Sequence, residues 1–194
     1  MAFNIGDIRG ALKGGGARPS LFQVTITNKV NTIADSITPF LVSATSIPAS
    51  NLSNIPIPYF GRYIKVAGTR TFSPWTVTVM NDEDFLIRNA MEQWTNTING
   101  LTSNLNGFGT PSPNDYKSQA TVIQYGKNGD ILREYSFSGI FPTSVSDMAL
   151  DWSQGNSIQQ FNVTFEYDYY NVTGGSTGTA SPGGTGLAVF PNNG

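Results

Sequence analysis

The chain has 194 residues, of which 12% are charged, and its net charge is −2. It contains neither Cys nor His, which excludes disulfides, thiolate metal sites and hydrolases built on Ser-His-Asp, Cys-His or HExxH constellations. The charged fraction is about half of the roughly 25% found in soluble domains. Protein–protein contacts are depleted in Lys, Glu and Asp. The composition therefore fits a self-associating subunit, and it fits a secreted β-protein equally well.

The length suits one domain, and the ends of the chain differ in composition from its middle. Residues 1–16 end in three glycines and are expected to form a flexible N-terminal arm, whereas residues 171–194 are rich in Gly, Ser and Thr and are expected to form a flexible tail. Residues 17–170 form the predicted domain. No apolar run approaches the ~20 residues that span a bilayer, and no signal-peptide pattern opens the chain, so synthesis in the cytoplasm is expected.

The first third of the domain predicts two strands followed by a proline-containing segment. Phe22, Val24 and Ile26 alternate with polar residues, which is typical of a half-buried strand, and a second strand is expected at Phe40–Ala44. The segment Ser50–Tyr59 contains two prolines and has no clean alternation. Because proline is excluded from central strands, the segment is predicted to be an exposed edge arm that reaches a neighbouring molecule, or an ordinary surface loop.

The segment Tyr63–Trp94 predicts two strand-like runs joined by a Gly-containing turn, and then a helix. In Trp75–Met80 apolar and polar residues alternate, which indicates a strand with one buried face. Asn81 or Asp82 is expected to cap a helix over about residues 82–98. The apolar stripe of this helix consists of Ile87, Ala90, Met91, Trp94 and Ile98.

The second half of the chain predicts a long loop and then further strands. Asn99–Asp115 is rich in Asn, Gly, Ser and Pro, and Gly139–Pro142 is expected to turn the chain. The predicted strands are Ser118–Tyr125, Ile131–Ser138, Ser144–Trp152 and Ser157–Tyr170, the first two joined by a hairpin at Gly126–Asp130. The expected fold is therefore mainly β: an antiparallel β-sandwich or barrel with one flanking α-helix.

The residues themselves predict no catalytic, cofactor-binding or metal site. The acidic cluster Asp82–Asp84 is explained by the preference of helix starts for negative charge. Two alternatives remain open. A glycosidase that works with paired carboxylates would draw on Asp147, Asp151, Glu166 and Asp168. A sugar-binding platform would draw on Tyr59, Phe60, Tyr63, Tyr167, Tyr169 and Tyr170, although core and interface packing accounts for these rings as well.

Several short motifs occur in an order that resembles the tail tube proteins of contractile-tailed bacteriophages. These motifs include Ala17–Val24, Ala44–Ala49, Val66–Phe72, Trp75–Glu83, Tyr116–Lys117, Gly139–Thr143, Leu150–Trp152, Ile158–Phe161 and Tyr167–Tyr169. Each motif alone is weak, but their order and spacing over residues 17–170 are specific. The chain departs from the pattern at its Gly-rich start, around Val30–Ser36 and after Asn171.

The resemblance implies a non-enzymatic structural subunit of the virion tail, with a β-sandwich fold and one helix and with no cofactor. Such subunits form homo-hexameric rings that stack into a tube inside a contractile sheath, with a baseplate and a tape measure protein as further partners. Double-stranded DNA passes through the lumen without sequence-specific binding, and neighbouring sheets join to line the channel. A channel that is neutral or mildly acidic is expected, because Lys and Arg contacts would hold the DNA.

The proline-containing arm is the expected contact between subunits or rings. Its candidate interface residues are Ile55, Pro56, Pro58, Tyr59, Phe60, Arg62 and Arg70. Two alternative functions remain at this point: the inner tube of a contractile injection system that delivers protein effectors, and a secreted carbohydrate-binding module, which would be a monomer with an exposed aromatic strip.

Overall fold

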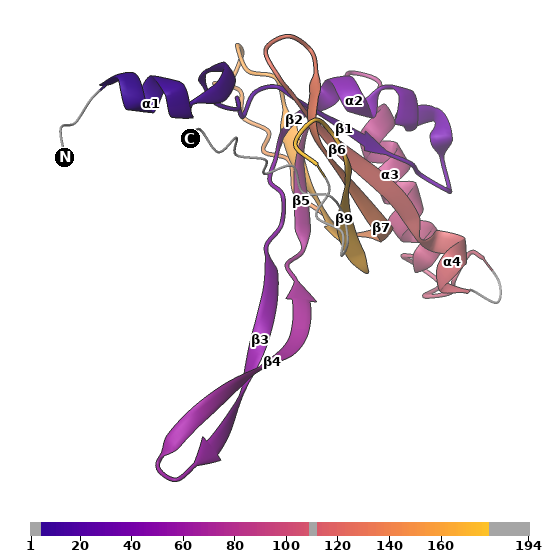
Figure 1. The fold of residues 1–194 in the computed structure, drawn as a ribbon. Helices are drawn as coiled ribbons and strands as arrows, with labels where there is room; N and C mark the ends of the chain where they lie inside the picture. The colour runs from indigo at the N-terminus through magenta and orange to yellow at the C-terminus, as the bar shows by residue number, and fades with distance from the viewer. Residues whose placement is uncertain (1–4, 109–111, 179–194) are drawn as a thin grey trace.

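A computed structural model describes residues 5–108 and 112–178 and shows a β-rich body with a long hairpin projecting from it (Figure 1). The α-helices other than the first lie on one side of the body (Figure 1). The helical elements are α1 (Ile5–Ala11), η1 (Lys13–Gly15), η2 (Thr32–Ser36), α2 (Thr38–Leu41), α3 (Leu86–Ile98) and α4 (Pro113–Tyr116). The strands are β1 (Phe22–Ile26), β2 (Val42–Thr45), β3 (Ser50–Tyr59), β4 (Arg62–Phe72), β5 (Trp75–Met80), β6 (Ser118–Tyr125), β7 (Ile131–Val145), β8 (Gln160–Glu166) and β9 (Tyr169–Gly174).

Strand β7 belongs to two sheets, which confirms the predicted antiparallel sandwich. Its first part pairs with β6 and β9, and with β1 these strands form sheet A. Its last five residues pair with β8, which continues through β5 to β2 as sheet B. Gly139 lies where the strand changes sheets, with φ at +72°. This left-handed backbone conformation favours glycine, and a Cβ atom there would also displace the carboxylate of Asp168.

The course of β7 corrects two sequence predictions. Gly139–Pro142 does not turn the chain but continues the strand, and β7 ends at Val145, so the strand predicted at Ser144–Trp152 is wrong. Ile140 is fully buried within this stretch. Phe137 and Ile140 are both buried although they are three residues apart, because the pairing with β6 shifts register at Gly139. The alternation expected of a single regular strand therefore does not continue across this point.

The core lies between the two sheets and follows the alternation predicted for β5. Trp75, Val77 and Val79 are buried, and the ring of Trp75 stacks on that of Phe137 in β7, with 4.5 Å between ring centroids and 10° between ring planes. Strand β8 contributes Phe165, whose ring centroid lies 5.5 Å from that of Trp75. Burial of several aromatic side chains at this point makes the sheet-to-sheet contact the main source of stability.

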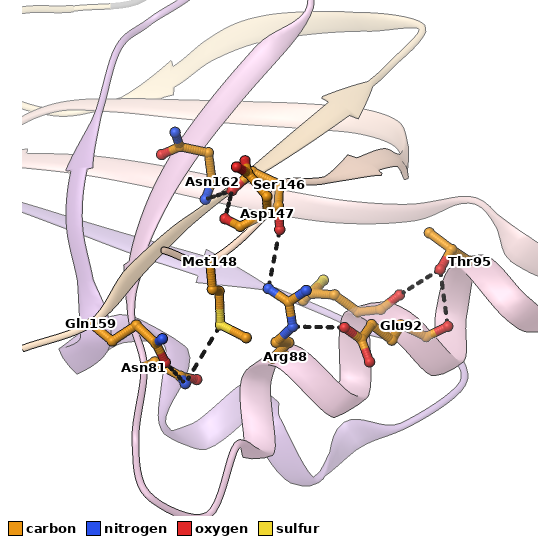
Figure 2. A network of polar contacts seen from close by, with 10 residues as sticks. Asn81, Arg88, Glu92, Thr95, Ser146, Asp147, Met148, Gln159 and Asn162 are labelled. Carbon is orange, nitrogen blue, oxygen red and sulfur yellow. Dashed lines mark hydrogen bonds and ion pairs between the residues drawn. The ribbon is translucent and has the colours of Figure 1, made fainter. Parts of the chain in front are cut away.

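Helix α3 packs on the core as predicted, but it begins at Leu86. Its buried residues are Ile87, Ala90, Met91 and Trp94. Phe85 is the N-terminal flanking residue, in left-handed conformation with φ at +53°, and no side chain caps the helix. The capping role predicted for Asn81 or Asp82 is therefore wrong. The side-chain amide of Asn81 instead donates to Gln159 Oε1 at 2.8 Å, and this bond ties the end of β5 to the start of β8 (Figure 2).

Elsewhere the predicted strands are found with shifted ends. The first strand and Ser118–Tyr125 are confirmed, whereas the second strand begins only at Val42, after the turn of α2. The final predicted strand, Ser157–Tyr170, divides into β8 and β9. Strand β9 includes residues 171–174, so the expected C-terminal tail begins within a sheet; its residues 179–194 lie outside the described residues.

Candidate functional site

Strands β3 and β4 form a hairpin, residues 50–72, that extends away from the body (Figure 1). The segment Ser50–Tyr59, which was predicted to be either a surface loop or an exposed edge arm, is therefore part of a projecting arm, and its backbone forms strand β3. No Gly-containing turn divides β4, which runs through Gly68 to Phe72. The strands are joined by Phe60 and Gly61, with φ at +41° and +79°, as a two-residue turn between right-twisted strands requires.

The register of the hairpin places apolar side chains on one of its faces. Ile55 lies opposite Val66 and Ile57 lies opposite Ile64, and all four are about half exposed. A two-stranded hairpin with no layer packed on it is at best marginally stable in water. The exposed face therefore needs a partner surface.

The two prolines of β3 account for its free edge. Pro56 and Pro58 are two residues apart, so their nitrogens face the same side of the strand, and β3 still pairs with β4 along this stretch. Because proline has no N–H group, the outer edge of β3 is poorly suited to pairing with another strand. Contact through a face of the hairpin is favoured over contact through its edge.

All seven predicted interface residues lie on this one element. Ile55, Pro56, Pro58, Tyr59, Phe60 and Arg62 occupy its outer half and turn, and all of these side chains are exposed. Arg70 lies near the root, where its guanidinium donates to Ser50 Oγ at 3.2 Å. The side chain of Phe60 at the turn is 90% exposed.

The root of the hairpin is held by two tyrosines that the sequence analysis did not assign to it. Tyr167 donates to the carbonyl of Ser73 at 2.9 Å, and Tyr170 donates to the carbonyl of Pro48 at 3.2 Å, so one tyrosine holds each end of the hairpin. The ring of Phe72 packs between them, with centroids 5.8 and 5.6 Å away. Burial raises the pKa of Tyr167 to about 12. In the sequence, only the cluster of tyrosines at residues 167–170 indicated that this segment has a special packing role.

The outer face of sheet B is a second surface of unusual composition. It carries hydroxyl and amide side chains that bond to one another: Thr78 Oγ1 donates to Asn162 Oδ1 at 2.8 Å, and the hydroxyls of Thr76 and Thr164 lie 3.5 Å apart. By strand register the face consists of Ala44, Thr76, Thr78, Met80, Phe141, Ser144, Gln160, Asn162, Thr164 and Glu166. Its single charge is negative.

Sheet B also has two unpaired edges within the described residues. Strand β2 pairs only with β5, and the last five residues of β7 pair only with β8. Successive strands of the sheet are antiparallel, so β2 and this part of β7 run in opposite directions. The edge of one copy therefore has the direction needed for antiparallel pairing with the other edge of a second copy.

The loop of residues 146–159, at the end of sheet B away from the hairpin, is held by hydrogen bonds at both of its ends (Figure 2). We call residues 81–85 and 146–159 together the acidic end. Arg88 donates to the carbonyl of Ser146 at 3.1 Å and pairs with Glu92 at 2.7 Å, while Asn81 binds Gln159. Between these ends the loop exposes Leu150 and Trp152.

Of the carboxylates considered for catalysis, Asp147 and Asp151 lie in the loop of the acidic end, whereas Glu166 ends β8 and Asp168 follows it. Asp168 pairs with Lys117 at 2.5 Å, and Asp151 accepts from Ser153, which lowers the pKa of Asp151. Within residues 5–108 and 112–178 no group of three or more acidic side chains is arranged to hold a metal ion. Of the aromatic residues of the sugar-platform alternative, Tyr59, Phe60 and Tyr63 lie on the hairpin and Tyr167 and Tyr170 at its root, whereas Tyr169 lies in β9 opposite Ser138.

A sandwich whose apolar arm and sheet edges have no partner among the described residues is the form expected of a structural subunit that assembles with other protein chains. Residues 17–173 match the family described as phage tail tube protein, and the chain belongs to that family. It is 38% identical over 168 residues to tail tube protein gp19 of Enterobacteria phage T4, covering 86% of this chain and 98% of the phage T4 protein. The tail tube protein of Serratia phage KSP90 is 27% identical and is covered over 93% of its length.

Solved structures from contractile particles share the fold. A chain of the anti-feeding prophage cap superimposes with a TM-score of 0.59 at 19% identity, covering 81% of this chain and 90% of that one. The sheath/tube terminator of an extracellular contractile injection system gives 0.56 at 17% identity, covering 79% and 94%. The protein is thus a structural subunit of a contractile phage tail tube, and its place is the virion tail. In the described part of the chain no helix is long and apolar enough to cross a membrane.

Proposed function

We propose that the chain forms homo-hexameric rings that stack into a hollow tube and that double-stranded DNA leaves the virion through its lumen. The sheath, the baseplate and a tape measure protein are the expected partners, and the subunit acts without catalysis or a cofactor. Membership of the tail tube family supports the tube itself. The main support for the ring is sheet B, whose outer face is nearly uncharged and whose two edge strands are unpaired in the described residues.

Ring closure is assigned to sheet B. The β2 edge of one subunit would pair with the last five residues of β7 in the next, and a head-to-tail contact of this kind closes into a ring when its rotation allows. Pairing between copies also removes two open strand edges that would otherwise invite aggregation. The four strands of each subunit then continue as one barrel around the channel.

Sheet A is less suited to this role because its edge strands are the first and last strands of the described chain. Residues 5–21 precede β1, and residues 175–178 follow β9. The amides of Ser176 and Thr177 donate to carbonyls at the start of β7, so this segment continues along the edge of sheet A. The edges of sheet B are formed by internal strands without such segments.

The outer face of sheet B, which we propose lines the channel, has the low charge needed for DNA to pass through without binding. Its hydroxyl and amide groups bond to one another, and Glu166 is its only charged residue. Phosphate contacts from Lys and Arg supply most nonspecific DNA affinity, and this face has none. DNA would therefore pass without being held.

The hairpin is proposed to make the contact with neighbouring subunits. Its apolar face supports this role, as does the exposed aromatic turn at Phe60. The injection-particle alternative shares the fold, but the two solved structures described above are only 17–19% identical to this chain, against 38% for the phage T4 protein. Neighbouring genes for a capsid and a terminase would distinguish a phage tail from such a particle.

Electron microscopy of the purified protein, with mass from light scattering, tests the assembly. Six-fold rings or hollow tubes are expected. A protein that stays monomeric at high concentration and in the presence of its baseplate would overturn the proposal.

A pair of lysine variants tests the channel wall. Tubes with Thr164→Lys, on the outer face of sheet B, are expected to retain DNA and slow its ejection. Tubes with Thr25→Lys, on the outer face of sheet A, are the matched control and should eject DNA normally. The reverse result would assign the channel to sheet A.

A further inference from the structure

The hairpin and the acidic end lie at opposite ends of sheet B (Figure 1). Strand β5 begins at Trp75, just after the hairpin returns to the body, and ends at Met80. Met80 pairs with Gln160, the first residue after the loop of the acidic end. Each subunit therefore carries the two surfaces at the two ends of the same strands.

Both surfaces expose apolar side chains without a partner in the described chain. The hairpin exposes its face of four aliphatic residues and the turn residue Phe60. At the acidic end Trp152 is fully exposed and Leu150 is 86% exposed. Exposed tryptophans that enter a partner's surface are typical energetic anchors of interfaces.

The two surfaces have opposite charge. The hairpin contains three basic residues and no acidic residue: Arg62, Lys65 and Arg70. The acidic end contains five acidic residues and no basic residue: Asp82, Glu83, Asp84, Asp147 and Asp151. Complementary charge of this kind guides association and fixes the orientation of the partners.

We propose that the hairpin of one subunit docks on the acidic end of a subunit in the next ring. The aliphatic face and Phe60 would cover Leu150 and Trp152, and the basic side chains would meet the carboxylates around them. A contact between opposite ends of identical subunits does not close on itself, so it repeats along the tube. This inference rests on the proposed stacked rings and names the surfaces that stack them.

The loop of the acidic end is ordered in the free subunit, which suits a surface on which a hairpin docks. Hydrogen bonds from Arg88 to Ser146 and from Asn81 to Gln159 fix both ends of the loop before any partner arrives (Figure 2). A surface that is already ordered loses less conformational entropy on binding. The hairpin is likewise held at its root by Tyr167 and Tyr170.

Disulfide cross-linking tests the contact cleanly because the chain has no cysteine. The variant Phe60→Cys/Trp152→Cys, assembled into tubes and oxidised, is expected to give covalent ladders of many subunits on a denaturing gel. The matched control is Phe60→Cys/Leu101→Cys, because Leu101 is equally exposed but lies after α3. Ladders from the first variant alone support the proposal.

Other outcomes separate this inference from the proposed function. Tubes that form normally but give no ladder with Trp152→Cys, or with Leu150→Cys in its place, would overturn the docking and leave the tube intact. Cross-linking of Phe60→Cys to the sheath would assign the hairpin to that partner and also overturn it. Failure of the wild-type chain to form tubes on its baseplate would reject the proposed function itself.

Charge reversal provides a second test that does not depend on cross-linking. Glu83, Asp84 and Asp147 are exposed, so changing all three to Lys should leave the fold and the rings intact but abolish stacking. The compensating variant Arg62→Glu/Lys65→Glu should restore tubes when combined with it. Full-length tubes from the triple variant alone would overturn the proposal.

Discussion

The body and the hairpin of this subunit are stabilised in opposite ways. In the body, two sheets bury Trp75 against Phe137, and every strand has a neighbour in the same chain. In the hairpin, the cross-strand pair Ile57 and Ile64 remains about half exposed. The core of the body is therefore already formed within one subunit, whereas the hairpin reaches its final environment only on assembly.

The contrast shows how a weakly charged chain can avoid premature aggregation. The body confines its open strand edges to short segments, and the outer edge of the hairpin carries Pro56 and Pro58. Such features oppose nonspecific strand pairing. Apolar contact is left to the face of the hairpin, where a specific partner surface is needed.

The largest effect is expected from truncating the core tryptophan. Trp75→Ala removes a fully buried ring and the hydrogen bond from Nε1 to Thr45 Oγ1, and we expect it to lower the free energy of unfolding by about 3–5 kcal/mol. Denaturant unfolding of the monomer measures this loss. Trp152→Ala is the matched control and should change the stability by less than about 0.5 kcal/mol. Equal losses would contradict the division between body and assembly surface.

A smaller effect is expected at the root of the hairpin. Tyr167→Phe leaves the carbonyl of Ser73 without its donor and should cost about 1 kcal/mol of unfolding free energy. Tyr63→Phe, on the exposed hairpin, is the control and should have no measurable effect. If both variants unfold like the wild type, the root does not depend on Tyr167.

The same tyrosine predicts a loss of stability at alkaline pH. Burial raises the pKa of Tyr167 in the folded state to about 12, above its ordinary value of 10.0. The neutral phenol therefore contributes fully below pH 10, and its contribution is lost as the pH rises through 12. Unfolding free energies across this range should fall less steeply for Tyr167→Phe than for the wild type. Identical slopes would contradict the assignment.

The smallest effect on the monomer is expected within the hairpin. Ile57→Ser/Ile64→Ser should leave the unfolding free energy of the body unchanged, because the hairpin projects from the body and both side chains are about half exposed (Figure 1). Tube formation, followed by electron microscopy, should nevertheless be lost. A destabilised monomer would show that the hairpin contributes to the body after all.

The strands that could be predicted from sequence are those with one buried face. Trp75–Met80 and Ser118–Tyr125 alternate because one side packs on the core. Strand β3 has both faces exposed, so no alternation marked it, and its prolines suggested a loop. The turn predicted at Gly139–Pro142 is instead the place where β7 changes sheets, which no local pattern encodes.

The candidate site was predicted only in part. The resemblance and the prolines pointed to the arm, and all seven predicted residues lie on the hairpin. Tyr167 and Tyr170 bond to the root of the hairpin, and Arg88 bonds to the carbonyl of Ser146. These hydrogen bonds join residues that are distant in sequence, so motif spacing could not predict them. The acids at 82–84 were attributed to a helix start, but α3 begins later and they form part of the acidic end.

Hydrogen exchange of the free subunit and of the assembled tube tests the central claim most directly. In the free subunit we expect the amides of β3 and β4 to exchange rapidly and those of β5 and β8 to be protected. In the tube the hairpin amides should become protected, while those of β5 and β8 stay as they were. A hairpin already protected in the monomer, or still unprotected in the tube, would contradict the account that assembly completes it.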